Sequence, residues 1–71
     1  MNQEEVLLTV IVPIYNMEGY LRQCLDSLSN QSQKNMQILL IDDGSVDGSA
    51  RICDEYQKKD PRMQAFHKKN G

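Results

Sequence analysis

The sequence predicts an α/β domain with the element order β-α-β-α-β, which corresponds to one half of a doubly wound fold with a parallel sheet. Three observations predict it. Two short apolar runs, at residues 7–13 and 36–41, have the composition of buried parallel strands. Each is followed by a stretch whose apolar residues recur at helical spacing. Each run also ends in polar residues, and the carboxyl ends of strands are where open α/β sheets bind ligands.

At its given length the sequence can form at most one small domain. The chain has 71 residues, of which 39% are hydrophobic and 25% charged, as in ordinary soluble globular proteins. The net charge of −2 provides no basic field that would favour nucleic acid. The basic residues near the C-terminus, Arg62 among them, are expected to form a solvated surface rather than a phosphate-binding patch.

The apolar run at residues 6–14 does not have the pattern of a signal peptide. Glu4 and Glu5 precede it where positive charge belongs, and the run is too short to span a bilayer. A cytoplasmic location is therefore expected. Cys24 and Cys53 lack the spacing of metal or redox motifs and are expected to be packed, free thiols.

The first half of the chain predicts a strand and a helix. The strand at residues 7–13 is expected to be covered on both faces and to end at Pro13. Asn16 can cap a helix over residues 17–30. The apolar residues expected on its buried stripe are Tyr20, Leu21, Cys24, Leu25 and Leu28.

The second half repeats this order. A strand at residues 36–41, also of the type covered on both faces, is followed by a turn at residues 42–45. Asp47 or Ser49 can cap a second helix that ends near residue 59. Its expected buried residues are Ala50, Ile52, Cys53 and Tyr56. Residues 63–67 are a weaker candidate for a third strand.

This order suggests a domain that continues past the given sequence. If the strands lie in the order 3-2-1, the first strand forms an edge without the lysine or mid-strand proline that usually blunts one. Residues 1–71 are therefore expected to be the N-terminal, nucleotide-binding part of a domain that extends beyond Gly71.

The first polar tip, after residues 7–13, suits a nucleoside better than a phosphate. It lacks the G-x-G-x-x-G pattern that holds a pyrophosphate at a helix N-terminus. Glu18 places a carboxylate where that phosphate would lie. Tyr15 offers an aromatic face on which a base can stack.

The second tip carries two adjacent carboxylates. An acidic residue at a strand end can accept hydrogen bonds from a ribose or a base edge. Asp42 and Asp43 leave the strand in opposite directions, so one is expected to contact ligand while the other holds the turn. Gly44 and Ser45 suit a tight turn, and Ser45 or Asp47 can satisfy free amides of the second helix.

Each feature also has a simpler interpretation. Pro13 can merely end a strand, Tyr15 can be a half-buried aromatic, and Glu18 can be a favourable charge at a helix N-terminus. The 42–45 segment can be a turn with caps, and His67 can be structural or exposed rather than catalytic. The joint occurrence at two strand tips favours a ligand site.

Two longer motifs resemble a known family. Val-Ile-Val-Pro-Ile-Tyr-Asn-Met-Glu at residues 10–18 and Ile-Asp-Asp-Gly-Ser-Val-Asp-Gly-Ser at residues 41–49 are similar to the opening of family-2 inverting glycosyltransferases. Asp60-Pro61-Arg62 and Asn70-Gly71 fit the same pattern. The resemblance implies a Rossmann-like GT-A fold, which has three α/β/α layers in the complete domain.

The resemblance also implies a function and residue roles. Such enzymes transfer a sugar from a nucleotide-sugar, commonly a uridine diphosphate sugar, to a hydroxyl of a saccharide or lipid-linked acceptor, as in cell-surface polysaccharide or glycolipid synthesis. Pro13 and Tyr15 would line the base pocket, and Asp43 would accept a hydrogen bond from uracil. Glu18 would lie at the margin of the pocket, and Asp42 would support the turn together with Gly44 and Ser45.

No catalytic residue or metal ligand is expected within this chain. In such enzymes the D-x-D motif, which binds Mn²⁺ or Mg²⁺, and the catalytic base would lie beyond Gly71. The full enzyme would be cytoplasmic, with peripheral association at the inner face of the membrane. Two rival hypotheses are a receiver-like signalling domain, suggested by the acidic pair after an apolar strand, and a noncatalytic remnant.

Overall fold

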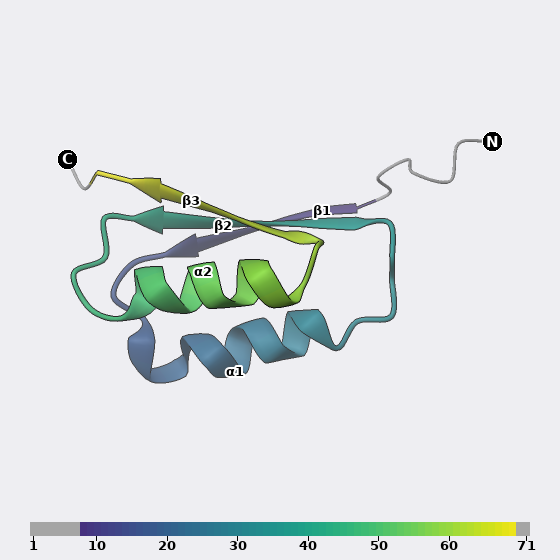
Figure 1. Cartoon of the computed structure of the whole chain (residues 1–71), viewed down its shortest axis with the longest axis horizontal. Helices are drawn as coiled ribbons and strands as arrows, with labels where there is room; N and C mark the ends of the chain where they lie inside the picture. Colours follow the sequence, from purple (N-terminus) through teal and green to yellow (C-terminus); the bar gives the residue numbers. More distant parts are fainter. Residues whose placement is uncertain (1–7, 70–71) are drawn as a thin grey trace.

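The computed structural model describes residues 8–69 and shows the expected alternation of strands and helices (Figure 1). The elements in chain order are β1 (Leu8–Ile14), α1 (Glu18–Ser29), β2 (Met36–Asp43), α2 (Ser49–Lys59) and β3 (Met63–Lys68). The predicted β-α-β-α-β order is confirmed, including the third strand, which runs one residue further than expected.

The three strands form one parallel sheet with β2 in the centre. Val10 lies opposite Ile38, and Ile38 lies opposite Met63. The strand order 3-2-1 is therefore confirmed, and β1 is an edge strand of the described sheet. All three carboxyl ends lie at the same edge (Figure 1).

Both helices lie on the same side of the sheet (Figure 1). Burial consequently alternates along the strands: Val12 and Ile14 are buried, whereas Ile11, which precedes Val12, is 64% exposed. The expectation that the first two strands are covered on both faces is wrong for the described residues. The connections step in one direction across the sheet, from β1 to β2 to β3, and right-handed crossovers in one direction place every helix on the same face.

The core lies between the sheet and the two helices. Its buried side chains are Val12, Ile14, Leu21, Leu25, Met36, Ile38, Leu40, Ile52, Cys53, Tyr56 and Met63. Cys24 is half-buried, and it and Cys53 are free thiols, as expected. Tyr20 does not extend the buried stripe of α1 because it points outward and is 62% exposed.

Pro13 lies inside β1 rather than ending it. The strand continues to Ile14, and Pro13 pairs in register with Ile41. A proline removes one backbone N–H from a strand, which is tolerated at the edge of a sheet, where β1 lies. The expected first strand is therefore confirmed, but the expectation that it ends at Pro13 is wrong.

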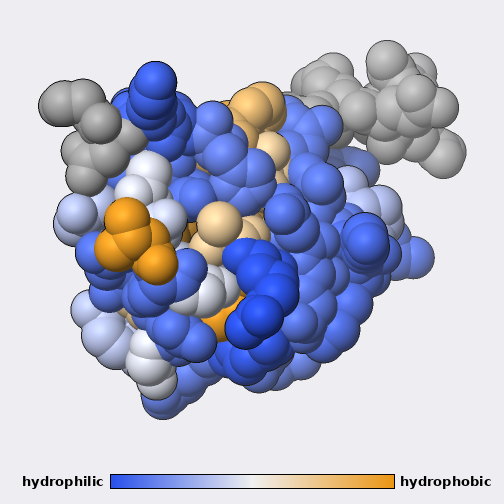
Figure 2. Space-filling view, turned by 60° about the vertical axis from the view of Figure 1, so that its left-hand side comes forward, coloured by the Kyte–Doolittle hydropathy of each residue, from blue (hydrophilic) through white to orange (hydrophobic). Residues whose placement is uncertain are grey.

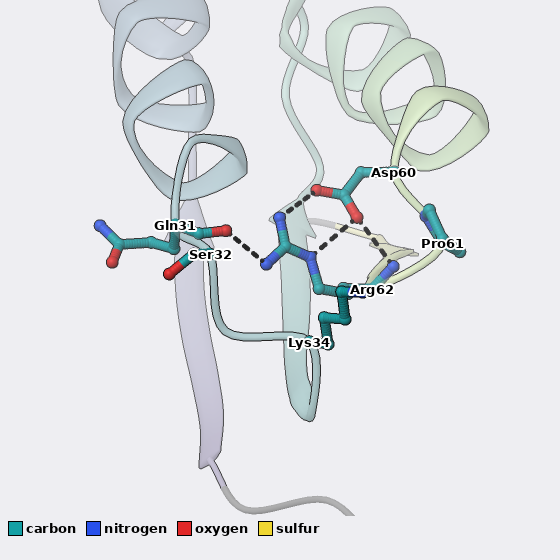
Figure 3. Close-up of a pocket in the computed structure, with 6 residues that line it drawn as sticks. All are labelled: Gln31, Ser32, Lys34, Asp60, Pro61 and Arg62. Carbon is teal, nitrogen blue, oxygen red and sulfur yellow. Dashed lines mark hydrogen bonds and ion pairs between the residues drawn. The ribbon is translucent and has the colours of Figure 1, made fainter. Parts of the chain in front are cut away.

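Arg62, just before β3, ties the ends of both helices together. Its guanidinium donates to the Ser29, Gln31 and Gln33 carbonyl oxygens after α1, at 3.0, 2.9 and 2.6 Å. It also forms a two-pronged ion pair with Asp60, whose side chain is 7% exposed (Figure 3). The expectation that Arg62 belongs to a solvated basic surface is wrong, because only 16% of its side chain is exposed.

Neither helix of the described region is long and apolar enough to cross a membrane.

Candidate functional site

The carboxyl ends of the strands and the loops that follow them form one edge of the molecule. Figure 2 brings this edge forward and shows a mostly hydrophilic surface that is interrupted by a few hydrophobic groups. The residues singled out in the sequence at both polar tips lie here, because β1 and β2 are adjacent and parallel.

The two loops at this edge are joined by hydrogen bonds between them. The backbone N–H of Asn16 donates to Ser45 Oγ at 3.0 Å, and Asn16 Oδ1 accepts from the N–H of Val46 at 2.9 Å. Asn16 has a positive φ of 49°, a conformation that asparagine tolerates better than most residues. The sequence suggested that Asn16 caps α1, and this is wrong. Asn16 holds the loop after β2 instead.

The two helices cap each other. The Asp47 carboxylate accepts from the N–H of Glu18 at 3.1 Å and from the N–H of Ser49 at 2.9 Å, so it serves both helix N-termini. In return, Ser49 Oγ accepts from the N–H of Met17, and Glu18 Oε1 accepts from the N–H of Gly48. Met17 and Gly48 are the N-cap residues, and neither has a side-chain cap of its own. We call this set of contacts the reciprocal cap.

The reciprocal cap differs from the expected local caps. Asp47 does satisfy an amide of α2, as predicted, but Ser49 and Ser45 serve the loop after β1 instead. Burial acts to raise the pKa of Asp47, but the hydrogen bonds from Ser49 and Glu18 outweigh it and lower that pKa. The charged form of Asp47 is thus the form that the two helices stabilise.

Gly48 and Glu18 provide a test of the reciprocal cap. A Cβ at Gly48 would lie 2.6 Å from Glu18 Oε2, so Gly48→Ala must displace the carboxylate that accepts from the Gly48 N–H. We expect Gly48→Ala and Glu18→Ala each to lower the free energy of unfolding by about 1 kcal/mol, the usual cost of a lost cap. The double variant should lose no more than either single one, as measured by urea denaturation. Additive losses would show that the two residues act separately.

Asp42 is buried and holds the turn. Its side chain is 3% exposed, Oδ1 accepts from the Ser45 N–H at 3.1 Å, and Oδ2 lies 2.8 Å from His67 Nδ1. Burial acts to raise the pKa of Asp42, but the hydrogen bonds from Ser45 and His67 outweigh it and lower that pKa. Gly44 has φ 71°, a conformation that side chains other than asparagine and aspartate disfavour, so glycine suits this turn.

Asp43 points to the opposite face from Asp42 and is accessible. Its side chain is 52% exposed, and its contact with Lys68 Nζ, at 3.9 Å, is a surface ion pair of the weak kind. Tyr15, which is 49% exposed, follows Ile14, and Ile14 is the register partner of Asp42. An exposed aromatic ring and an exposed carboxylate therefore come from adjacent strand ends.

The other residues predicted for the site are placed as follows. Pro13 is exposed on the sheet face that the helices leave open, the face that also carries Asp43. Glu18 is at the same edge, but its carboxylate is bonded to the Gly48 N–H. The sequence analysis did not predict the contact between His67 and Asp42. The register of β2 and β3 would have indicated it, because the two residues are direct strand partners.

A cavity of about 440 Å³ lies at the opposite end of the sheet, away from the two polar tips. Its lining residues are Gln31, Ser32, Lys34, Asp60, Pro61 and Arg62 (Figure 3). Every N–H of the Arg62 guanidinium is already donated to a carbonyl or to Asp60, so this cation has no donor left for a ligand. We therefore place the candidate site at the carboxyl edge.

The described residues do not provide a metal centre. Nowhere in residues 8–69 do three or more histidine, cysteine, aspartate or glutamate side chains lie where they could share a metal ion. Asp42, the carboxylate next to Asp43, is already bonded to Ser45 and His67. The divalent metal implied by the family resemblance does not fit these residues alone.

The sequence over residues 9–71 matches the model of the family described as glycosyl transferase family 2. The chain belongs to glycosyltransferase family 2. The glycosyltransferase GlyA of Streptococcus pneumoniae is 48% identical over 63 residues, which are 89% of this chain and 9% of GlyA. GlyG of the same organism is 42% identical over 64 residues, 90% of this chain and 21% of GlyG.

A third relative carries a more specific name. The minor teichoic acid biosynthesis protein GgaA of Bacillus subtilis is 45% identical over 58 residues, 78% of this chain and 13% of GgaA. The chain thus spans only about a tenth to a fifth of the length of these relatives. Membership of glycosyltransferase family 2 confirms the predicted family and removes the receiver-domain hypothesis.

Proposed function

We propose that the carboxyl edge of the sheet binds the nucleoside part of a nucleotide-sugar donor, a uridine diphosphate sugar, in a family-2 glycosyltransferase. One observation carries this proposal. Tyr15 and Asp43 are exposed on adjacent strand ends, while the surrounding motif residues are bonded within the protein. The edge thus offers a ligand one aromatic face and one carboxylate on a fixed support.

These two groups suit a uracil base. The Tyr15 ring can stack on the base, and the Asp43 carboxylate can accept from the ring N–H that lies between the two uracil carbonyls. Asp43 would exchange only its weak surface pair with Lys68 for this bond. Pro13 would support the base from the open sheet face. We assign Glu18 to holding the loops rather than to contacting ligand, since its carboxylate is already engaged.

The transfer step itself would need groups outside the described residues. Deprotonating a hydroxyl acceptor requires a carboxylate base, and a leaving diphosphate requires compensation of its charge by a divalent ion such as Mn²⁺ or Mg²⁺. We propose that both come from residues beyond Gly71, and we assign neither role here. A saccharide or lipid-linked acceptor, a role in cell-surface polymer synthesis, and a cytoplasmic location with peripheral membrane association stay predictions.

Base recognition by Asp43 can be tested by calorimetry on the full gene product, with uridine diphosphate and cytidine diphosphate as ligands in the presence of Mn²⁺. Cytosine lacks the ring N–H that uracil donates. We expect Asp43→Asn to weaken binding of uridine diphosphate about tenfold, because a charge-assisted hydrogen bond is lost, and to reduce the preference over cytidine diphosphate.

Lys68→Ala is the matched control. It removes the partner of Asp43 without removing the carboxylate, so binding of uridine diphosphate should be unchanged or slightly tighter. Wild-type affinity in Asp43→Asn would remove Asp43 from the site. Equal losses in both variants would mean that the ion pair, and not base recognition, matters. A full gene product that binds neither nucleotide would support the noncatalytic remnant.

A further inference from the structure

His67 lies between two carboxylates from different elements. Its Nδ1 is 2.8 Å from Asp42 Oδ2 on β2, and its Nε2 is 2.7 Å from Asp54 Oδ1 on α2. His67 itself is on β3, so one imidazole connects the two strands and the helix. Its side chain is 39% exposed, whereas that of Asp42 is only 3% exposed.

This geometry fixes the protonation state of the ring. An ionised carboxylate only accepts hydrogen bonds, and a neutral imidazole has one N–H and one lone pair. Both nitrogens can bond to carboxylates only when both carry a proton, which is the imidazolium form. The hydrogen bonds to Asp54 and Asp42 accordingly raise the pKa of His67 above its ordinary value.

The ring is linked to the proposed nucleoside site through Asp42. The second oxygen of Asp42 accepts from the Ser45 N–H, which closes the 42–45 turn. Asp43 is inside that turn and carries the exposed carboxylate. The contacts therefore run without a break from Asp54 on α2 through His67 and Asp42 to the turn that presents Asp43.

We propose that His67 is a positioning residue, which as an imidazolium clamps Asp42 to α2 and thereby sets the orientation of the 42–45 turn and of Asp43. The effect of this clamp on nucleotide binding rests on the proposed function, whereas the clamp itself does not. His67 does not contact the ligand in this assignment; it acts through Asp42.

The clamp should weaken as pH rises. The titratable groups that face the ring are Asp42 and Asp54. Nearby Cys53 does not titrate in this range, because its burial and, to a smaller extent, the charges of Asp42 and Asp54 raise its pKa to about 11. A neutral ring can donate to one carboxylate only. It is expected to donate to Asp42, because leaving a buried carboxylate without a partner costs more free energy. The folded-state pKa of His67 is raised, so its stabilisation is complete below pH about 6.5 and is lost as pH rises through that pKa.

The clamp can be measured directly by NMR, because His67 is the single histidine of the chain. We expect both ring nitrogens to be protonated at pH 6.5, and the backbone amides of Gly44 and Ser45 to shift with the same midpoint as the ring. A ring that titrates at or below its ordinary pKa, or amides that ignore its titration, would overturn the proposal.

Two variants complete the test. Asp54→Asn keeps the fold and the contact to Asp42 but removes one charge, so the midpoint of the ring and of the amides should fall together. In the full gene product, affinity for uridine diphosphate should drop several-fold more between pH 6.5 and 8.5 in the wild type than in His67→Gln. Titration of the ligand itself affects both proteins equally, so the difference between them reports on His67. Equal pH dependence in the two proteins would contradict positioning of Asp43. Absence of nucleotide binding at every pH, with the amide shifts intact, would refute the proposed function alone.

Discussion

Replacing Arg62 with alanine is expected to lower the free energy of unfolding by about 3 kcal/mol, because it removes one partner of a buried ion pair and leaves Asp60 without it. The same change leaves the Ser29, Gln31 and Gln33 carbonyl groups at the end of α1 without their donor. A domain of this size has a total stability of only several kcal/mol, so a large unfolded fraction should result. Urea denaturation followed by circular dichroism measures the loss.

Arg22→Ala is the matched control for Arg62→Ala. Arg22 also forms a two-pronged pair with a carboxylate, that of Glu55, but the two side chains are 49% and 38% exposed. Exposed pairs contribute little because water and salt already screen the charges. The Arg22 variant should therefore remain close to the wild type. Comparable losses in the two variants would show that burial is not what gives the Arg62 pair its effect.

The sequence was sufficient for the order of elements but not for the layers around the sheet. Apolar residues occupy both faces of β1 and β2, for example Val12 and Ile11, so periodicity alone predicts cover on both sides. Which face a helix covers depends on the direction in which the crossovers step across the sheet. That direction is a property of the whole topology, and no local pattern contains it.

The same limit applies to the site. Local rules correctly paired Asp47 with an amide of α2, and they correctly placed Asp42 and Asp43 on opposite faces. They assigned Asn16 to its own helix, whereas its side-chain partner is 30 residues away. The contact between His67 and Asp42 likewise depends on the register of β2 and β3. Capping preferences indicate which residue types accept a hydrogen bond from a free amide. They do not indicate which amide the fold places next to such a residue.

These long-range contacts give the site its character. Three of the four hydrogen bonds of the reciprocal cap join the segment after β1 to the segment after β2, so the two segments are held at a fixed spacing before any ligand arrives. A site organised in advance loses less conformational entropy on binding. Most residues of the two motifs thus support the site, and the groups proposed to contact ligand are fewer: Tyr15, Asp43 and Pro13.

Tyr15→Ala should produce the largest loss of nucleotide affinity among the variants considered. Removing an aromatic platform from under a base costs about 1 to 3 kcal/mol, which corresponds to roughly a tenfold to hundredfold increase in Kd for uridine diphosphate. Tyr15→Phe should retain most of the affinity, because the ring face and not the hydroxyl stacks on the base. The stability of the fold should change little, since Tyr15 is 49% exposed. Calorimetry on the full gene product measures the affinity.

Tyr20→Ala separates this effect from a general loss of surface aromatic area. Tyr20 is also exposed, at 62%, but it projects from α1 and not from a strand end. It should leave the Kd for uridine diphosphate unchanged. If Tyr15→Ala and Tyr20→Ala bind equally well, the aromatic face at the end of β1 is not part of the pocket, and only Asp43 and Pro13 would be left as base contacts. If Tyr15→Phe loses as much affinity as Tyr15→Ala, the hydroxyl rather than the ring would be the recognition element, which a stacking interaction does not allow.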